Sequence, residues 1–163
     1  GGGGGPGQPG CGAAAATAAA VAAGDEVVAT LRKVFGLDGF RPVQREVIDT
    51  TLSGKDAFVL LPTGGGKSLC YQLPALLRRG VTLVVSPLLS LMHDQVEHLR
   101  RLGVRADMLS AASSPAEAKR ALEEEEEGGG RLLYVTPERL AKSAAFMSWL
   151  RRRDLSGGLA ALA

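Results

Sequence analysis

The sequence lacks two features that would place it in common protein classes. No stretch approaches the roughly 20 consecutive apolar residues of a membrane-spanning helix, so we expect a soluble protein with no membrane partner. Cysteine is scarce, since Cys11 and Cys70 are the only two, too few for a zinc cluster. Cys11 lies in a low-complexity stretch and Cys70 in an expected helix, which argues against a disulfide framework and fits a reducing compartment.

Residues 1–24 also lack any side chain large enough to build a core. Glycine and alanine dominate this stretch, and we expect a disordered low-complexity tail. No basic residue precedes Arg32, and the tail has neither arginine nor serine, so we expect no secretory signal and no organelle transit peptide. Residues 25–163 suit one domain, and the net charge of +2 does not by itself indicate a nucleic-acid partner.

Short apolar runs that alternate with helical patterns set the expected fold. Continuous apolar runs at residues 57–61, 82–86 and 132–136 predict strands covered on both faces, as in a parallel sheet. Two further strands are expected at 105–109 and 158–163. Helical spacing predicts helices at 25–36, 43–52, 68–79, 88–102, 115–127 and 137–152. Repetition of strand and helix predicts an α/β fold with right-handed crossovers.

A glycine-rich loop, Leu61-Pro62-Thr63-Gly64-Gly65-Gly66-Lys67-Ser68, lies between the first expected strand and the next helix. This is the context of a phosphate-binding loop, because glycines let backbone N–H groups surround phosphates and the helix adds its positive dipole end. Lys67 would reach the β- and γ-phosphates, and the Ser68 hydroxyl would hold Mg²⁺. The usual pattern has glycine where Leu61 stands, and the alternative is a plain glycine-rich turn. Gly-Lys-Ser in this position favours nucleotide binding.

A glutamine upstream of the loop is a candidate for base recognition. Gln44 lies 23 positions before Lys67, in Phe40-Arg41-Pro42-Val43-Gln44. An amide both donates and accepts hydrogen bonds, which matches an adenine edge and would select ATP over GTP. Taken alone, Gln44 is better explained as a surface helix residue. Together with Phe40, Arg41 and the loop, it resembles the adenine-recognition motif of superfamily 2 helicases.

Three runs resemble the RecQ family of DNA helicases. They are residues 61–76 around the loop, Val84-Val85-Ser86-Pro87-Leu88-Leu89-Ser90-Leu91-Met92-His93-Asp94-Gln95-Val96, and Tyr134-Val135-Thr136-Pro137-Glu138-Arg139-Leu140. Their order and spacing agree with the family from about Phe35 onward. The run from Ala141 to Met147 is most similar to the Q-one type of RecQ helicase.

This resemblance implies a 3′-to-5′ DNA-unwinding motor of two RecA-like lobes, with ATP and Mg²⁺ between the lobes. By position, Arg41 and Gln44 would contact adenine, and Ser86-Pro87 and Thr136-Pro137 would meet the DNA backbone. Residue types alone favour helix capping for Ser86 and Thr136. Leu37 stands where many relatives carry an aromatic ring, so base stacking is not expected there.

The resemblance also sets expectations about what the 163 residues hold. The family's acidic Asp-Glu-x-His box should follow a strand such as residues 159–163, and no such sequence occurs. We therefore expect an incomplete first helicase lobe with no catalytic residue of its own, which binds ATP weakly and does not unwind DNA. Zinc is expected only in a C-terminal region of the parent protein. The family further implies single-stranded and junction DNA as partners and a nuclear location.

Two other functions remain open from sequence. One is a different phosphate-loop enzyme, such as a small kinase or GTPase, against which Gln44 and Thr136-Pro137-Glu138 argue. The other is a non-catalytic product that binds ATP or single-stranded DNA and interferes with intact helicase. Oligomeric state is not indicated.

Overall fold

The computed structural model describes residues 24–123 and 129–163, which divide into two compact units at Gly39 and Phe40. The expected tail at 1–24 falls almost wholly outside the described residues. In the first unit, residues 24–35 form a helix, which Gly36 ends in a left-handed conformation (φ 64°). Among the described helices, none is long and apolar enough to cross a membrane.

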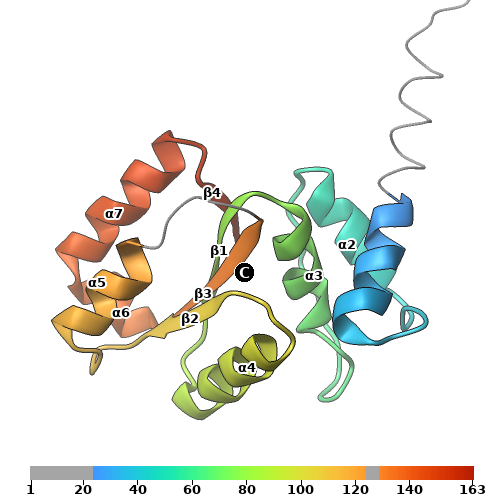
Figure 1. Ribbon diagram of the computed structural model, residues 1–163, viewed down its shortest axis with the longest axis horizontal. Coiled ribbons are helices and arrows are strands. Elements are labelled where there is room, and N and C mark those ends of the chain that lie inside the picture. Colours follow the sequence, from blue (N-terminus) through green and yellow to red (C-terminus); the bar gives the residue numbers. More distant parts are fainter. Residues whose placement is uncertain (1–23, 124–128) are drawn as a thin grey trace, which may run out of the picture. The chain divides into compact units, whose positions relative to one another are not determined.

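The second unit, from Phe40 to Ala163, is built on a four-stranded parallel sheet (Figure 1). Its strands lie in the order β2-β3-β1-β4. Their bounds are β1 Gly80–Val85, β2 Ala106–Leu109, β3 Gly130–Val135 and β4 Leu159–Leu162. The central pair runs in register from Gly80 opposite Gly130 to Val85 opposite Val135. The expected parallel sheet is therefore confirmed.

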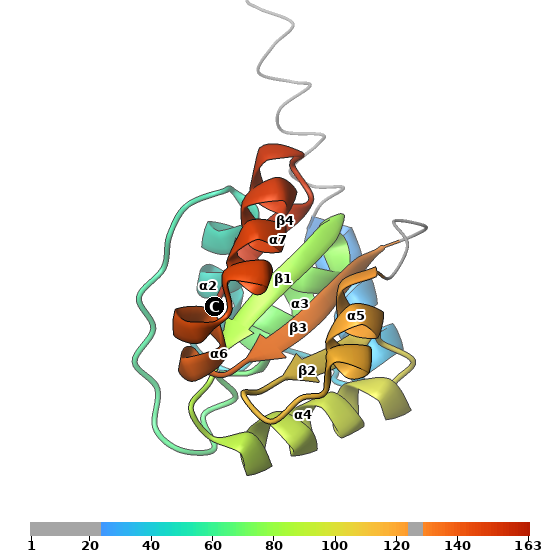
Figure 2. The same ribbon diagram turned by 90° about the vertical axis from the view of Figure 1, so that its left-hand side faces the viewer.

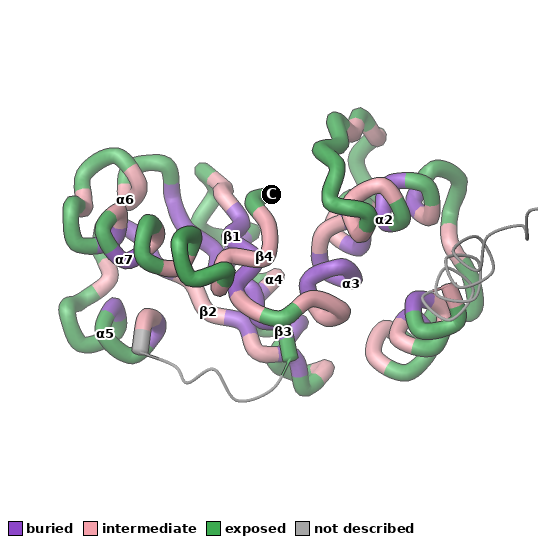
Figure 3. The backbone as a smooth tube through the Cα atoms, turned by 90° about the horizontal axis from the view of Figure 1, so that it is seen from above, coloured by how far each residue is buried: buried purple, intermediate pink, exposed green. Residues whose placement is uncertain are grey.

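Helices cover both faces of this sheet. They are α2 Gln44–Leu52, α3 Leu69–Leu77, α4 Leu89–Arg101, α5 Pro115–Glu123, α6 Pro137–Lys142 and α7 Ala144–Leu155. Helices α5 and α7 pack on one face, where Leu83, Leu133 and Phe146 belong to one core cluster. Helix α3 contacts β3 and helix α4 contacts β2. Burial is highest along the central strands and falls toward the helix surfaces (Figure 3).

One expected strand is wrong. Residues 57–61 are extended but belong to no sheet, and the chain between α2 and α3 runs as a loop apart from the four strands (Figure 2). Phe58 is 97% exposed and Leu60 is 87% exposed. A strand needs a lateral hydrogen-bonding partner, and none of the four described strands pairs with this segment. The apolar run therefore lies outside the core.

The single helix expected at 137–152 is also wrong, because the structure has two helices there. Ser143 separates α6 from α7 with an extended backbone (φ −105°, ψ 95°). Its hydroxyl accepts a hydrogen bond from the Phe146 amide (3.2 Å), so it caps the start of α7. The resulting turn brings Phe146 and Trp149 into the core cluster.

Candidate functional site: the glycine-rich loop and its neighbours

The glycine-rich loop adopts a tight turn that requires glycine. Gly64 and Gly66 have positive φ angles of 78° and 80°, a region that other residues rarely enter. The Gly65 amide donates to the Pro62 carbonyl (2.9 Å), and a side chain at Gly65 would place its Cβ 2.8 Å from that oxygen. The loop is thus closed on itself at Pro62 and Gly65, and its later residues lead directly into α3.

Three consecutive backbone amides at the end of the loop are not used by the fold. Among the described residues, the N–H groups of Gly66, Lys67 and Ser68 donate to no backbone carbonyl. Helix α3 begins immediately after them at Leu69, and its first amides bond to the Gly66 and Lys67 carbonyls. Free amides at a helix N-terminus attract anions, because they add hydrogen bonds to the positive end of the helix dipole. This part of the loop is suited to phosphate.

The Lys67 ammonium lies over the same loop. Its Nζ donates to the Leu61 carbonyl (2.8 Å) and the Pro62 carbonyl (3.3 Å), while the side chain remains exposed. Both partners are neutral oxygens at the surface, so an anionic phosphate would compete for this ammonium on favourable terms. The Ser68 side chain makes no capping hydrogen bond and is half-buried. Unused loop amides, an exposed ammonium and a hydroxyl without a capping bond therefore occur together at the start of α3.

Arg41 and Gln44 bind the loop from the side of α2. Gln44 is 3% exposed, and its Nε2 donates to the Gly66 carbonyl (3.0 Å) while its Oε1 accepts from the Arg41 amide (2.8 Å). The Arg41 guanidinium donates to the Gly64 carbonyl. A Cβ at Gly66 would lie 2.3 Å from Gln44 Nε2, so glycine is what admits the glutamine. The Gln44 amide keeps one hydrogen on Nε2 and one lone pair on Oε1 for a further partner.

The backbone between these two residues is strained. Val43 has a φ of 72°, the one positive φ among the described non-glycine residues. A β-branched residue in this region is a clear outlier, and such strain costs on the order of 1–3 kcal/mol. Val43 is 51% exposed, so its side chain gains little burial in return. The strained residue turns the chain so that Gln44 starts α2 facing the loop.

A cavity of about 720 Å³ adjoins the loop. Lys67, Tyr71, Thr82 and the β4 strand line it. The Thr82 hydroxyl is buried and has no hydrogen-bond partner among the described residues. Burial raises the pKa of the Cys70 thiol on the same wall, which keeps this thiol protonated and weakly reactive. The cavity therefore offers polar groups beside the lysine.

The four candidate DNA-contact residues follow two neighbouring strands. Ser86 follows β1 and Thr136 follows β3, and the Ser86 amide donates to the Val135 carbonyl (3.0 Å), so the two junctions are adjacent. Thr136 is 3% exposed, and its hydroxyl caps α6 by accepting from the Arg139 amide (3.3 Å). Ser86 Oγ accepts from the Leu88 amide (3.4 Å). Pro87 and Pro137 are exposed beside them.

Comparison with known proteins places most of the second unit in one family. A family model described as DEAD/DEAH box helicase matches residues 41–157. The chain belongs to the DEAD/DEAH box helicase family. The match begins at Arg41 and includes the loop, both strand-to-helix junctions and α7, so every residue placed in the candidate site lies within it.

Individual relatives confirm the resemblance to RecQ helicases. The chain is 52% identical over 130 residues to a putative ATP-dependent DNA helicase Q1 of Caenorhabditis elegans, covering 78% of this chain and 21% of the relative. It is 48% identical over 140 residues to the ATP-dependent DNA helicase Q1 of Rattus norvegicus, covering 85% and 22%. It is 54% identical over 119 residues to the ATP-dependent DNA helicase Q-like 4B of Arabidopsis thaliana, covering 72% and 10%. The chain thus spans about a fifth of the length of the Q1 relatives.

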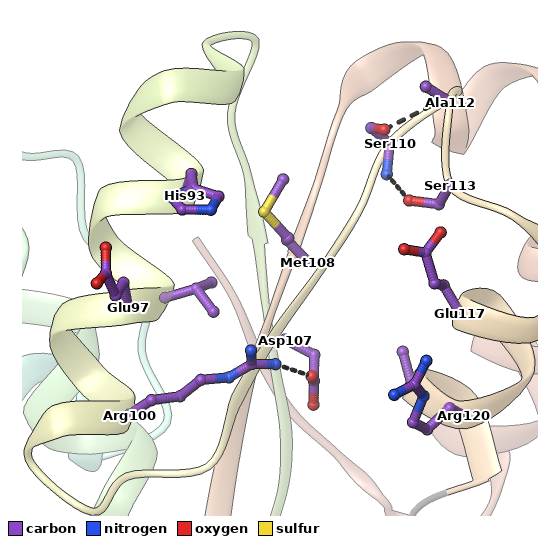
Figure 4. Close-up of a pocket in the computed structure, with 12 residues that line it drawn as sticks. His93, Glu97, Arg100, Asp107, Met108, Ser110, Ala112, Ser113, Glu117 and Arg120 are labelled. Carbon is purple, nitrogen blue, oxygen red and sulfur yellow. Dashed lines mark hydrogen bonds and ion pairs between the residues drawn. The ribbon is translucent and has the colours of Figure 1, made fainter.

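A second hollow of this helicase domain, about 640 Å³, lies along the outer edge of β2, between α4 and α5 (Figure 4). In a parallel ladder, every second residue directs its backbone N–H and C=O groups toward the partner strand. Along β2 and the residue before it, Arg105 and Leu109 accept hydrogen bonds from β3 and the residue after it. The backbone groups of Ala106, Met108 and Ser110 therefore point away from β3. Arg100 Nε donates to the Ala106 carbonyl (2.8 Å), and Ser113 bonds both backbone groups of Ser110. Most of this edge is therefore capped, which limits strand addition here.

Replacing Arg100 should open this edge. Arg100→Met keeps the aliphatic stem but removes the donor to the Ala106 carbonyl and the ion pair with Asp107. We expect more self-association, because an uncapped strand edge is a template for pairing with another chain. Sedimentation velocity at several protein concentrations would measure it. Arg101→Met is the matched control, since Arg101 pairs with Glu97 on the helix surface, and equal self-association of both variants would contradict the prediction.

Sequence reasoning missed one feature near the site. Gln72, Gln95 and Tyr134 form hydrogen bonds to one another beneath α3. One signal for this feature was present in the sequence, because Gln72 is a polar residue within the largely apolar helix Leu69–Leu77, where it is buried. Gln95 and Tyr134 both lie in runs that resemble RecQ helicases, but neither residue type nor spacing predicts a hydrogen bond between them and Gln72.

Proposed function

We propose that this chain is the nucleotide-binding part of a RecQ-type ATP-dependent DNA helicase. The observation that carries the proposal is the convergence of three unused amides, at Gly66, Lys67 and Ser68, with the Lys67 ammonium at the start of α3. Such a set binds phosphate groups. Thr63, Gly64 and Gly65 complete the loop around them.

Adenine recognition is assigned to Arg41 and Gln44. Both already contact the loop, so a base beside them would belong to the same nucleotide whose phosphates the loop binds. The unused hydrogen and lone pair of the Gln44 amide match the paired acceptor and donor of an adenine edge. Guanine presents acceptors at both corresponding positions, so ATP should bind better than GTP.

Mg²⁺ fits this site through one protein group. The Ser68 hydroxyl is free of any capping bond and follows the lysine directly. Mg²⁺ at phosphates commonly takes one or two protein oxygens and completes its shell with phosphate oxygens and water. The ion would neutralise phosphate charge, while Lys67 and the loop amides orient the phosphates.

DNA contact is assigned to the two adjacent junctions, Ser86-Pro87 and Thr136-Pro137. Ligands of open parallel sheets collect beyond the carboxyl ends of the strands, which is where both junctions lie. Serine and threonine hydroxyls and helix N-terminal amides contact phosphates in protein–DNA interfaces. The Thr136 hydroxyl is committed to a cap as acceptor and remains a donor, so its contact with a phosphate would be through O–H.

Competition binding tests the nucleotide proposal. A fluorescent ATP analogue is bound to the chain in the presence of Mg²⁺, and unlabelled ATP and GTP are titrated against it. We expect ATP to displace the probe at least about tenfold better than GTP, the value of one lost bidentate contact. Equal displacement, or a preference for GTP, would favour a different phosphate-loop enzyme. No binding of the probe would reject the nucleotide site itself.

A further inference from the structure

Four polar side chains meet in the layer between α3, α4 and β3. Gln72 Nε2 donates to Gln95 Oε1 (2.7 Å) and to the Tyr134 hydroxyl (3.2 Å). The Tyr134 and Tyr71 hydroxyls lie 3.4 Å apart, with their rings edge to face. Gln72 is 4% exposed and Tyr134 is 1% exposed. We call Tyr71, Gln72, Gln95 and Tyr134 the polar cluster.

The polar cluster buries amide and hydroxyl groups between a helix and a sheet, which is unfavourable unless these groups are hydrogen-bonded. A buried amide or phenol that lacks a partner loses about 1–3 kcal/mol, so each member depends on the others. The Gln72 amide donates one hydrogen bond to α4, through Gln95, and one to β3, through Tyr134. Burial raises the pKa of the Tyr134 phenol, so its hydroxyl keeps its proton. A change in the position of α3 therefore alters hydrogen bonds on both neighbours.

Each of the three elements also begins or ends at a proposed ligand site. Helix α3 follows Ser68 directly, and the Gln72 backbone amide donates to the Ser68 carbonyl (2.9 Å). Strand β3 ends at Val135, next to Thr136, and α4 starts three residues after Ser86. Unbroken bonded contacts thus run from the phosphate loop through Gln72 to both DNA-facing junctions.

We propose that Gln72 is a positioning residue that couples nucleotide binding at the loop to DNA binding at the Ser86 and Thr136 junctions. This inference rests on the proposed function. Phosphate binding draws the loop amides and Lys67 toward the ligand, and the first turn of α3 follows. The polar cluster passes that shift to β3 and α4. Because coupling is reciprocal, DNA must strengthen or weaken nucleotide binding by the same factor.

Thermodynamic linkage tests the coupling. The Kd of a labelled single-stranded oligonucleotide is measured at fixed salt with and without a saturating non-hydrolysable ATP analogue and Mg²⁺. We expect the two Kd values of the unmodified chain to differ by about fivefold or more, the usual lower range for coupled sites. In Gln72→Met, which keeps the side-chain length and removes both donors, the two values should agree within about twofold. ATP-analogue affinity without DNA should stay within about threefold.

A purely structural role gives a different result. If Gln72 only holds α3 in place, Gln72→Met lowers stability and changes both DNA affinities together, which leaves their ratio intact and overturns the inference. Ser110→Ala is the matched control, since it removes another buried, hydrogen-bonded hydroxyl that lies outside both the polar cluster and the phosphate site, and its ratio should equal that of the unmodified chain.

A second variant protects the test against misfolding. Gln95 is half-buried on α4, so Gln95→Met should fold even if Gln72→Met does not, and it should also reduce the ratio. An unchanged ratio in a folded Gln95→Met would overturn the inference. A ratio of one in the unmodified chain overturns the coupling but leaves nucleotide binding standing. Failure to bind the ATP analogue at all overturns the proposed function instead.

Discussion

Lys67→Ala is expected to lower the affinity for ATP about 100-fold. The Lys67 ammonium would exchange two neutral carbonyl partners, those of Leu61 and Pro62, for charged phosphate oxygens. A hydrogen bond to a charged group contributes about 1.5–3 kcal/mol, and about 1.4 kcal/mol corresponds to a factor of ten in affinity. Two phosphate contacts therefore account for a loss of this size. Titration calorimetry with an ATP analogue and Mg²⁺ would measure it.

The control for this experiment removes the same charge elsewhere. Lys142 is exposed on α6, outside the loop, and Lys142→Ala should leave the affinity within about twofold, because an exposed charge acts only weakly through solvent. Lys67 is exposed too, so Lys67→Ala should change the free energy of unfolding by less than about 0.5 kcal/mol. If Lys67→Ala is stable and keeps full affinity for ATP, the phosphates of ATP do not bind at this loop.

All four described strands overlap residues that the sequence predicted as strands, including the edge strands β2 and β4 at 105–109 and 158–163. Residues 82–86 and 132–136 correspond to β1 and β3, the central pair, whose residues are almost all buried. Residues 57–61 have the same apolar character, but a strand also needs a lateral partner, and pairing is a long-range property that composition does not contain. The structure pairs them with no described strand.

The two helices that replace the single one expected at 137–152 are separated by a residue with a recognisable capping preference. Ser143 interrupts a helical pattern and caps the next helix, and serine is a preferred residue for that position. Apolar residues recur at helical spacing on both sides of Ser143, so the periodicity predicted one continuous helix. Strong periodicity predicts that helices exist, whereas their ends depend on single capping bonds.

The site was predictable to the extent that it is continuous in sequence. The loop and the following helix are local, and the structure brings Gln44 against Gly66 over a separation of 22 residues. The polar cluster was not predictable, because Gln72 and Tyr134 are 62 residues apart and neither spacing nor residue type pairs them. The strain at Val43 was hidden for a similar reason, since valine itself argues against a left-handed backbone.

Of the variants discussed, Gly130→Ala should cause the largest decrease in the free energy of unfolding. Gly130 is the first residue of β3, and a Cβ there would lie 1.6 Å from the Ala75 carbonyl oxygen and 2.4 Å from the Arg78 carbonyl oxygen. Both obstacles are backbone atoms at the end of α3, so no side-chain rotation relieves the clash. Overpacking costs about 1–3 kcal/mol where side chains give way, and we expect about 3 kcal/mol or more here.

Urea unfolding of Gly130→Ala and Gly39→Ala would measure this difference. Gly39 has no atom within 4 Å of an added Cβ and no positive φ, so Gly39→Ala should be nearly neutral. Because α3 starts at the phosphate loop, displacing its far end in Gly130→Ala should also weaken ATP binding in any fraction that remains folded. A loss below about 1 kcal/mol, similar to a tolerated surface change, would mean that α3 does not press on β3 at this point, and the route from the loop to β3 would then depend on Gln72 alone.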